Sequence, residues 1–154
     1  MARLGLTPTV FYRDPKAALD WLQRAFGFEI AMLLNDAEGN IAHCEVSVGD
    51  ANLGVAGEWA GPQLGGAKMK SPASLEGAST QFLWVDVEDI DAHAAKAEAA
   101  GARIAQKPED QFYGDRTYRA LDPEGHVWCF RQKVAEVSLA EMEQKTGLKF
   151  AVTS

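Results

Sequence analysis

In the first part of the chain, apolar strand-like stretches lie on both sides of one segment whose apolar residues recur at helical spacing. Residues 6–12 are mostly apolar and strand-like, and residues 15–26 place apolar side chains at helical spacing. Asp14 suits the N-cap of that helix, Pro15 its first turn and Gly27 its C-terminal stop. Three more strands are expected at residues 28–34, 41–48 and 52–56. The pattern predicts one strand, one helix and three strands.

The same order recurs in the second part of the chain. Residues 80–85 are apolar and strand-like, and residues 89–100 form a helical stripe that Gly101 closes. Three further strands are expected at residues 102–106, 117–121 and 127–131. Because one order of elements recurs across the chain, we interpret the sequence as a tandem repeat.

The remaining segments divide the chain. A stretch rich in Gly, Pro, Ser and Ala joins the two units and is typical of a linker or mobile flap. Near the C-terminus, Ser138 and Glu141 match a capping box for a short amphipathic helix ending at Thr146. We therefore expect one structural domain with four parts: a first module, a linker or flap, a second module, and a C-terminal helix with its tail, at residues 1–57, 58–79, 80–133 and 134–154.

The composition limits which kinds of molecule the protein is expected to bind. With 154 residues, 47% of them hydrophobic, the chain is an ordinary globular protein, and its formal charge of −7 argues against nucleic acid. That charge could attract a cationic ligand or simply confer solubility. No apolar run is long enough to span a membrane, and no secretory pattern begins the sequence. Cys44 and Cys129 are isolated, as in a reduced protein, so we expect a cytoplasmic location without membrane partners.

Two motifs near the end of the repeat indicate a family. A Phe-Tyr-Gly-Asp-Arg run occupies residues 112–116, and an Asp-Pro-Glu-Gly-His turn occupies residues 122–126. With the repeat, they resemble the vicinal oxygen chelate superfamily, which contains glyoxalase I, bleomycin-resistance proteins and extradiol dioxygenases. The resemblance covers residues 6–132. The His-Cys-Glu run at residues 43–45, followed by Gly49-Asp50, is similar to the PhnB-like subgroup.

The resemblance implies an α+β fold. Two tandem βαβββ modules would form a cupped, half-closed mixed β-sheet with helices on its outer face. In the metal-dependent members, the ligands come from the first and last strands of each module. By position, these ligands fall on Thr7, Gly54, Gln81 and Cys129.

The side chains at these four positions are poor metal ligands. Divalent metals in such sites need at least three good donors from His, Glu, Asp or Cys. Thr7 is a weak ligand, Gly54 offers none, Gln81 alone is weak, and Cys129 binds only as a thiolate. We therefore predict no cofactor and no metal. The alternative is a divalent metal in a site rebuilt from His43, Glu45, Gln81 and Cys129.

Strand alternation then assigns the two faces of the sheet. If the four matched positions face the cup, the residues expected beside them are Thr9, Phe11, Asn52, Ala56, Leu83, Val85, Val127 and Arg131. The residues expected under the helices are Val10, Phe82, Trp84, Trp128 and Phe130. Trp84 and Trp128 are therefore predicted to be core residues. His93 and His126 are predicted to be exposed, without a role.

Two polar groups are candidates for chemistry or binding. His43 and Glu45 lie two apart on one strand face, so they could act as an acid–base pair, form a polar cluster at the cup edge, or anchor a metal. Tyr113, Asp115 and Arg116 cluster at a glycine in a loop, and Arg119 is expected on the cup-facing side of the next strand. Either Arg116 or Arg119 could clamp a carboxylate or phosphate. An Asp115–Arg116 pair that only holds the loop is the alternative.

Trp59 lies between two glycines in the linker and has no periodic place in a strand or helix. We predict that it forms a lid over the cup or a dimer contact. The edge strands of a half-closed cup also favour a homodimer.

Three functions remain open. The first is a bleomycin-resistance-like module that binds a small molecule in a groove at a dimer interface, without metal. The second is a lyase, isomerase or dioxygenase that uses a rebuilt metal site or the His43/Glu45 pair. The third is a dimer of this fold whose ligand is undetermined. The candidate ligand-binding residues are Thr7, Thr9, Phe11, Asn52, Trp59, Gln81, Leu83, Tyr113, Arg116, Arg119 and Cys129.

Overall fold

The computed structural model describes residues 5–151, which form two four-stranded sheets of the same topology. The first has the order β1-β4-β3-β2 and the second β7-β10-β9-β8. β1 runs parallel to β4 and β7 parallel to β10, whereas the other neighbours are antiparallel. The strands of these sheets are β1 (Thr9–Tyr12), β2 (Glu29–Asn35), β3 (Ile41–Val48), β4 (Ala51–Gly57), β7 (Leu83–Asp86), β8 (Arg103–Asp110), β9 (Asp115–Leu121) and β10 (Val127–Lys133).

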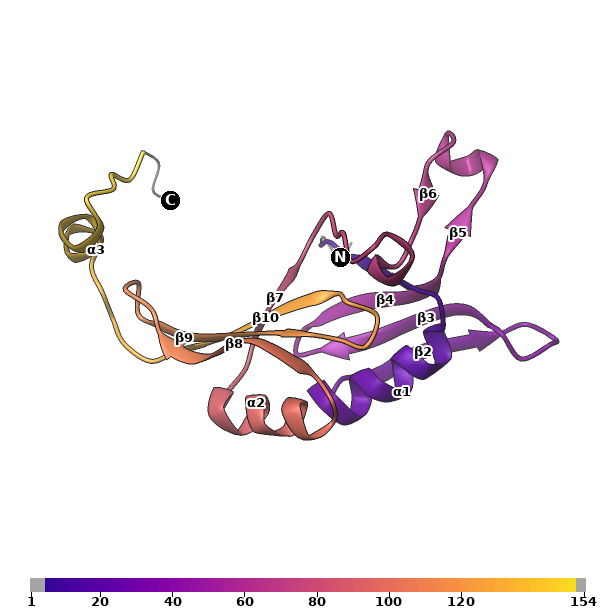
Figure 1. Ribbon diagram of the computed structural model, residues 1–154, viewed down its shortest axis with the longest axis horizontal. Coiled ribbons are helices and arrows are strands. Elements are labelled where there is room, and N and C mark those ends of the chain that lie inside the picture. Colours follow the sequence, from indigo (N-terminus) through magenta and orange to yellow (C-terminus); the bar gives the residue numbers. More distant parts are fainter. Residues whose placement is uncertain (1–4, 152–154) are drawn as a thin grey trace, which may run out of the picture.

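The sheets lie side by side as a mixed α+β fold, and the described residues form no closed barrel. Helices α1 (Pro15–Phe26) and α2 (Ile90–Ala99) cover the same face of the two sheets (Figure 1). The other face is not covered by a helix of either module, and we call it the open face. The α+β fold class that the resemblance implies is confirmed.

The predicted caps of the first helix are confirmed. The Asp14 carboxylate accepts a hydrogen bond from the backbone N–H of Ala17 at 3.0 Å, which satisfies one of the free donors at the helix start. At the other end, Gly27 adopts the left-handed conformation with φ 72°, and its N–H donates to the Gln23 carbonyl. These two residues fix where α1 begins and ends.

The predicted linker contains regular structure. It holds a hairpin of two short strands, β5 (Trp59–Ala60) and β6 (Lys68–Met69), with 3₁₀ turns at Pro62–Leu64 and Pro72–Ser74. The hairpin projects from the open face (Figure 1). The prolines and glycines that suggested a flap therefore shape its turns.

The C-terminal helix α3 (Leu139–Thr146) has the predicted capping box. The Ser138 hydroxyl accepts from the Glu141 N–H, and the Glu141 carboxylate accepts from the Ser138 N–H at 2.8 Å. No residue of α3 is buried, and it lies at the end of the molecule away from the β5–β6 hairpin.

The hydrophobic core lies between the helices and the covered face of both sheets. The Phe26 ring at the end of α1 meets Trp128 and Phe130 of β10, with centroid distances of 5.5 and 4.8 Å. Aromatic contacts of this kind add to the burial of apolar area. The two halves therefore share one core, and the prediction that Trp128 and Phe130 belong to it is confirmed.

The predicted orientation of the edge strand β7 was wrong. Leu83 and Val85 were expected to face the cup, and Phe82 and Trp84 to lie under the helices. Val85 is 8% exposed and lies in the core, with Leu83 packed against it, whereas Trp84 is 38% exposed and Phe82 53% exposed. The run at residues 82–85 is apolar throughout, so its alternation does not reveal which side chains face the helices. Phe82 and Trp84 therefore belong to the open face.

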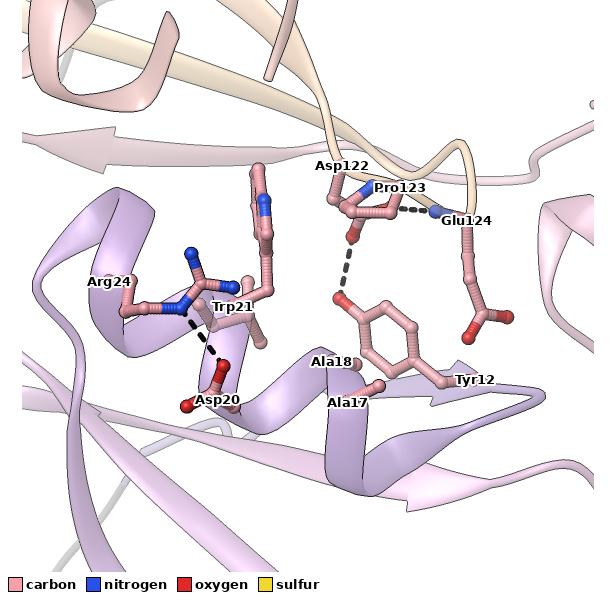
Figure 2. Close-up of a pocket in the computed structure, with 10 residues that line it drawn as sticks. Tyr12, Ala17, Ala18, Asp20, Trp21, Arg24, Asp122, Pro123 and Glu124 are labelled. Atoms are coloured by element: carbon pink, nitrogen blue, oxygen red, sulfur yellow. Dashed lines mark hydrogen bonds and ion pairs between the residues drawn. The ribbon is translucent and has the colours of Figure 1, made fainter. Parts of the chain in front are cut away.

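A buried carboxylate joins the two halves at the turn before β10. Asp122 is 5% exposed and accepts hydrogen bonds from the Tyr12 hydroxyl at 2.7 Å and from the Trp128 indole N–H at 3.1 Å. Its second oxygen accepts from the backbone N–H groups of Glu124 and His126, each at 3.0 Å. A cavity of about 290 Å³ lies beside this junction, next to α1 (Figure 2). Because these donors already occupy the Asp122 carboxylate, we assign it a structural role.

The prediction that His93 and His126 are exposed was wrong. His126 Nε2 lies 2.7 Å from the Phe11 carbonyl oxygen, which ties the turn to β1. His93 Nε2 lies 3.3 Å from the Phe26 carbonyl, and Nδ1 lies 2.6 Å from the Tyr118 hydroxyl oxygen. Because the carbonyl can only accept, Nε2 donates and the neutral ring accepts from Tyr118. Burial lowers the pKa of His93 and opposes its protonation.

Candidate functional site

Four adjacent residues cross the middle of each sheet on the open face. We call each set the central row of its sheet. The row of the first sheet consists of Thr9, Gly54, Glu45 and Met32. The row of the second sheet consists of Trp84, Cys129, Arg119 and Gln106. The two rows occupy matching strands, so the repeat places different side chains in equivalent positions.

A cavity of about 450 Å³ lies over the first row. Thr9 and Phe11 of β1, His43 of β3 and Gly54 of β4 line it, and Trp59 of the hairpin lines it as well. Since Val10 and Tyr12 alternate with Thr9 and Phe11 and are buried in the core, β1 turns its open-face side chains into this hollow.

Two neighbouring cavities extend the hollow. One, of about 450 Å³, shares Thr9 and Phe11 and adds Gln81 and residues 68–70 of the hairpin. The other, of about 460 Å³, is lined by Thr7, Glu45 and Asn52 among others. β1 and the hairpin therefore stand between cavities on the open face.

The predicted pair on β3 is in contact. His43 Nε2 lies 3.2 Å from Glu45 Oε1, and the Asn52 amide donates to Glu45 Oε2 at 3.1 Å. The His43 side chain is 52% exposed and that of Glu45 26% exposed. The Asn52 amide thus holds the carboxylate that orients the imidazole, an arrangement suited to proton transfer or to a fixed polar contact with a ligand.

The positions matched to the family metal site do not offer suitable donors. Thr7 and Gln81 precede β1 and β7, and the residues directly beside Gly54 and Cys129 are Thr9 and Trp84. Among residues 5–151, no group of three or more His, Cys, Asp or Glu side chains could hold a metal ion.

The space at these positions is also restricted. A Cβ atom at Gly54 would lie 2.5 Å from Thr9 Oγ1, so the Thr9 side chain occupies the space that a ligating side chain at position 54 would need. Cys129 is fully buried, and burial raises the pKa of its thiol and so disfavours the thiolate that binds metal. These side chains do not fit a divalent metal.

The second row carries aromatic and cationic groups. Arg119 Cζ lies 6.0 Å and Arg131 Cζ 5.7 Å from the centre of the Trp84 ring, within range of a cation–π contact. Arg131 also pairs with Asp86 at 2.6 Å. Burial and then Asp115 raise the pKa of Tyr113, and Arg119 and Arg131 lie close enough to oppose that rise. The predicted residues Tyr113, Arg119 and Cys129 therefore meet here.

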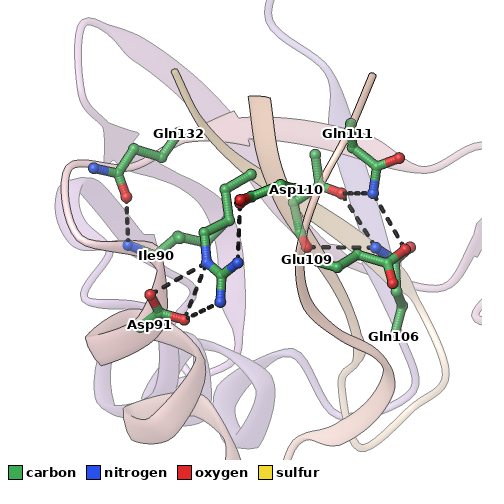
Figure 3. Close-up of polar contacts among 9 residues, drawn as sticks. Ile90, Asp91, Gln106, Glu109, Asp110, Gln111 and Gln132 are labelled. Atoms are coloured by element: carbon green, nitrogen blue, oxygen red, sulfur yellow. Dashed lines mark hydrogen bonds and ion pairs between the residues drawn. The ribbon is translucent and has the colours of Figure 1, made fainter. Parts of the chain in front are cut away.

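Arg116 points elsewhere. Its guanidinium donates to Asp91 of α2 and to Asp110 of β8, each with a contact of 3.0 Å (Figure 3). The hydrogen bonds to Asp91 and then to Asp110 raise the pKa of Arg116. The predicted Asp115–Arg116 pair was therefore wrong, because the carboxylates that hold Arg116 are Asp91 and Asp110.

The predicted residues thus fall into separate groups. Thr9, Phe11, His43 and Trp59 line one cavity, whereas Leu83 packs toward the core. The sequence interpretation missed Trp84 and the hairpin side chains of residues 68–70. A signal for the hairpin was present, because Pro62, Gly65 and Gly66 separate two short stretches that could pair.

The repeated βαβββ topology and the open cup define a class of small-molecule-binding folds, and sequence comparison identifies its family. Residues 6–130 match the model of the Glyoxalase/Bleomycin resistance protein/Dioxygenase superfamily. The chain belongs to this superfamily. Within the described residues, no helix is long and apolar enough to cross a membrane.

Relatives at moderate identity include mycobacterial proteins and a solved structure. An uncharacterised protein of Mycobacterium bovis is 30% identical over 139 residues, which cover 90% of each chain. The crystal structure of TioX from Micromonospora sp. ML1 is 29% identical and has a TM-score of 0.65, covering 84% of this chain and 99% of TioX.

More distant structures share the fold alone. TnmS3, an antibiotic binding protein from Streptomyces sp. CB03234, is 21% identical with a TM-score of 0.62, covering 86% of this chain and 98% of TnmS3. FosX, a fosfomycin resistance protein from Listeria monocytogenes solved with Mn(II) and sulfate, is 15% identical with a TM-score of 0.59, covering 94% and 98%.

Proposed function

We propose that this protein binds a small organic molecule on the open face and does so without the metal of its superfamily. The observation that carries the proposal is the set of side chains across β1, β4, β7 and β10. Thr9, Gly54, Trp84 and Cys129 offer a divalent metal no adequate set of donors. The space around Thr9 and Phe11 nevertheless remains hollow.

The hairpin supports a binding role. Trp59 is 47% exposed and lines the cavity from outside the sheet, so its ring can cover a molecule bound against β1. TnmS3, which shares the fold, is described as an antibiotic binding protein. The run of residues 43–45 with Gly49-Asp50 supports placing the chain in the PhnB-like subgroup.

A homodimer is part of the proposal. Every residue of the edge strand β2 is exposed, and its apolar side chains Ile30, Met32, Leu33 and Leu34 are between 39% and 55% exposed. An unpaired apolar edge of this kind favours association with another chain. A second copy that covers part of the open face would also enclose the ligand.

Thermal unfolding tests the proposal. The protein, purified without chelator, is assayed for metal content and then heated with Ni²⁺, Zn²⁺, Mn²⁺ or Fe²⁺ and with a panel of planar aromatic antibiotics. We expect no stoichiometric metal and no metal-induced shift. An organic ligand at a hundredfold excess over its Kd should stabilise the protein by about 2.7 kcal/mol.

Two variants sharpen that experiment. Trp59→Ala should weaken the ligand-induced rise in unfolding temperature. Phe150→Ala, which removes another exposed aromatic ring from the C-terminal segment after α3, should not. Bound metal that disappears in His43→Ala or Glu45→Ala would refute the metal-free site and favour a lyase or dioxygenase.

The contact of His43, Glu45 and Asn52 favours a second candidate, an acid–base enzyme that uses no metal. A general base oriented by a carboxylate is a common arrangement in catalysis. Its test is mass spectrometry of a bound ligand after incubation. Conversion that His43→Gln abolishes while binding persists would establish this candidate, and an unchanged ligand would reject it.

A further inference from the structure

We infer that the central row of the second sheet is an anion subsite that binds the carboxylate of a planar aromatic ligand. Arg119 would hold the carboxylate, and the ring system would lie against Trp84. This inference rests on the proposed binding function and names a ligand class for it. It is an inference about local charge, because the whole chain has a formal charge of −7.

Arg119 differs from the two arginines near it. Arg116 is taken by Asp91 and Asp110, and Arg131 by Asp86 at 2.6 Å. Across residues 5–151, no carboxylate lies within ion-pair distance of Arg119, which is exposed on the open face. Its guanidinium donors are therefore available to a ligand.

The surroundings hold this guanidinium in place. Arg119 lies over the Trp84 ring and opposite Cys129 in the β9–β10 register. Because cation–π contact restricts a long side chain, less rotamer freedom is lost when a ligand binds. Cys129 is fully buried and leaves no hole in the floor between Trp84 and Arg119.

Trp84 provides the apolar part of the subsite. It is 38% exposed, and the Phe82 ring lies 6.2 Å away in an edge-to-face contact, itself 53% exposed. Two exposed aromatic rings at the edge of a cup can stack on a flat ligand.

Neither nearby carboxylate pairs with Arg119. Among the described residues, Asp86 is paired with Arg131, and Lys133, which lies opposite Asp115 in the β9–β10 register, pairs with Glu136 instead. One guanidinium matches one carboxylate by two parallel hydrogen bonds, whereas a phosphate dianion would keep a charge that no second free cation of this row meets. The row therefore favours a monoanionic carboxylate.

Isothermal titration calorimetry with two probes tests the inference. 2-Naphthoate carries the carboxylate, and 2-naphthamide is its neutral counterpart of nearly the same shape. We expect the wild-type protein to bind 2-naphthoate about tenfold more tightly, which is the gain of one charge-assisted bidentate contact on an exposed surface. The preference should shrink as salt is added.

Variants assign that preference to Arg119. Arg119→Gln should bind both probes equally, and Arg119→Lys should keep part of the preference because it retains the charge. Arg24→Gln is the matched control, because it removes one exposed arginine from α1, away from the open face. Trp84→Ala should weaken both probes. Thermal unfolding of each variant verifies that it is folded.

Three outcomes would overturn the inference. Equal binding of the two probes by the wild-type protein would show that a ring suffices, and a preference that survives in Arg119→Gln would place the anion elsewhere. In both outcomes the proposed binding function stands, because an aromatic molecule still binds. Binding of neither probe would also refute the subsite, and the antibiotic panel with Trp59→Ala then decides the proposed function by itself.

Discussion

The central rows of the two sheets have the same topology and opposite chemistry. At matching positions on the third strand of each module, the first sheet has Glu45 and the second has Arg119. On the fourth strand, Gly54 leaves a hollow where Cys129 fills the surface. The repeat thus supplies a common scaffold, and each half acquires its own site through a few side chains. A ligand that spans both rows would meet a carboxylate at one end and a guanidinium at the other.

The largest expected loss of stability comes from breaking the buried Asp122 junction between the two halves. Asp122→Ala leaves the Tyr12 hydroxyl and the Trp128 indole N–H without their buried acceptor. We expect a loss of about 3 kcal/mol in the free energy of unfolding, measured with urea.

The control for that experiment is Asp20→Ala. The Asp20 side chain is 70% exposed and its pair with Arg24 lies at the surface, so this variant should change stability by at most about 0.5 kcal/mol. If both variants lose the same stability, the Asp122 junction does not hold the two halves together.

A smaller effect should follow from adding a side chain at Gly54 in the first row. Gly54→Ala places a Cβ atom 2.5 Å from Thr9 Oγ1, and the Thr9 side chain or the strand that carries it must shift to accept it. We expect the free energy of unfolding to fall by about 2 kcal/mol. In a Thr9→Ala background, which removes that oxygen, most of the loss should disappear in a double-mutant cycle. An equal loss in both backgrounds would mean that Thr9 is not the obstacle.

The smallest effect concerns pH and the coupling of the halves through His93. Burial lowers the folded-state pKa of His93 below its ordinary value of 6.5, so protons bind the unfolded chain more readily. The contribution of neutral His93 to the free energy of unfolding is therefore fully present above pH 6.5, and it is lost as the pH falls through the folded-state pKa. The carboxyl groups with lowered pKa values, such as Glu58, contribute at lower pH. Urea unfolding between pH 7 and 5 should show this decline, and His93→Gln should flatten it.

The sequence predicted the order of elements because each signal was local. Asp14, Gly27 and the Ser138–Glu141 capping box act within one helical turn, and all three were identified from spacing alone. The hairpin within residues 58–79 was not predicted, because each of its strands has only two residues, too few for an alternating pattern.

The candidate site was less predictable because it depends on register and on distant partners. His43 and Glu45 were identified from alternation within one strand, and they are in contact. Trp84 was assigned to the core because the run around it is apolar on both faces. For Arg116, the deciding partner Asp91 lies on another element, and no local pattern reveals such a pair.

The hairpin over the open face has a consequence for protein engineering. Its base is held firmly, because the Glu58 carboxylate accepts from Lys70 and from the Ser71 N–H, and the Ser71 hydroxyl donates to Glu124. Within the described residues, the backbone hydrogen bonds of its tip at residues 61–67 stay inside the tip. A segment with a fixed base and an independent tip tolerates exchange. Loops of new sequence grafted at residues 61–67 should therefore leave the two sheets as they are.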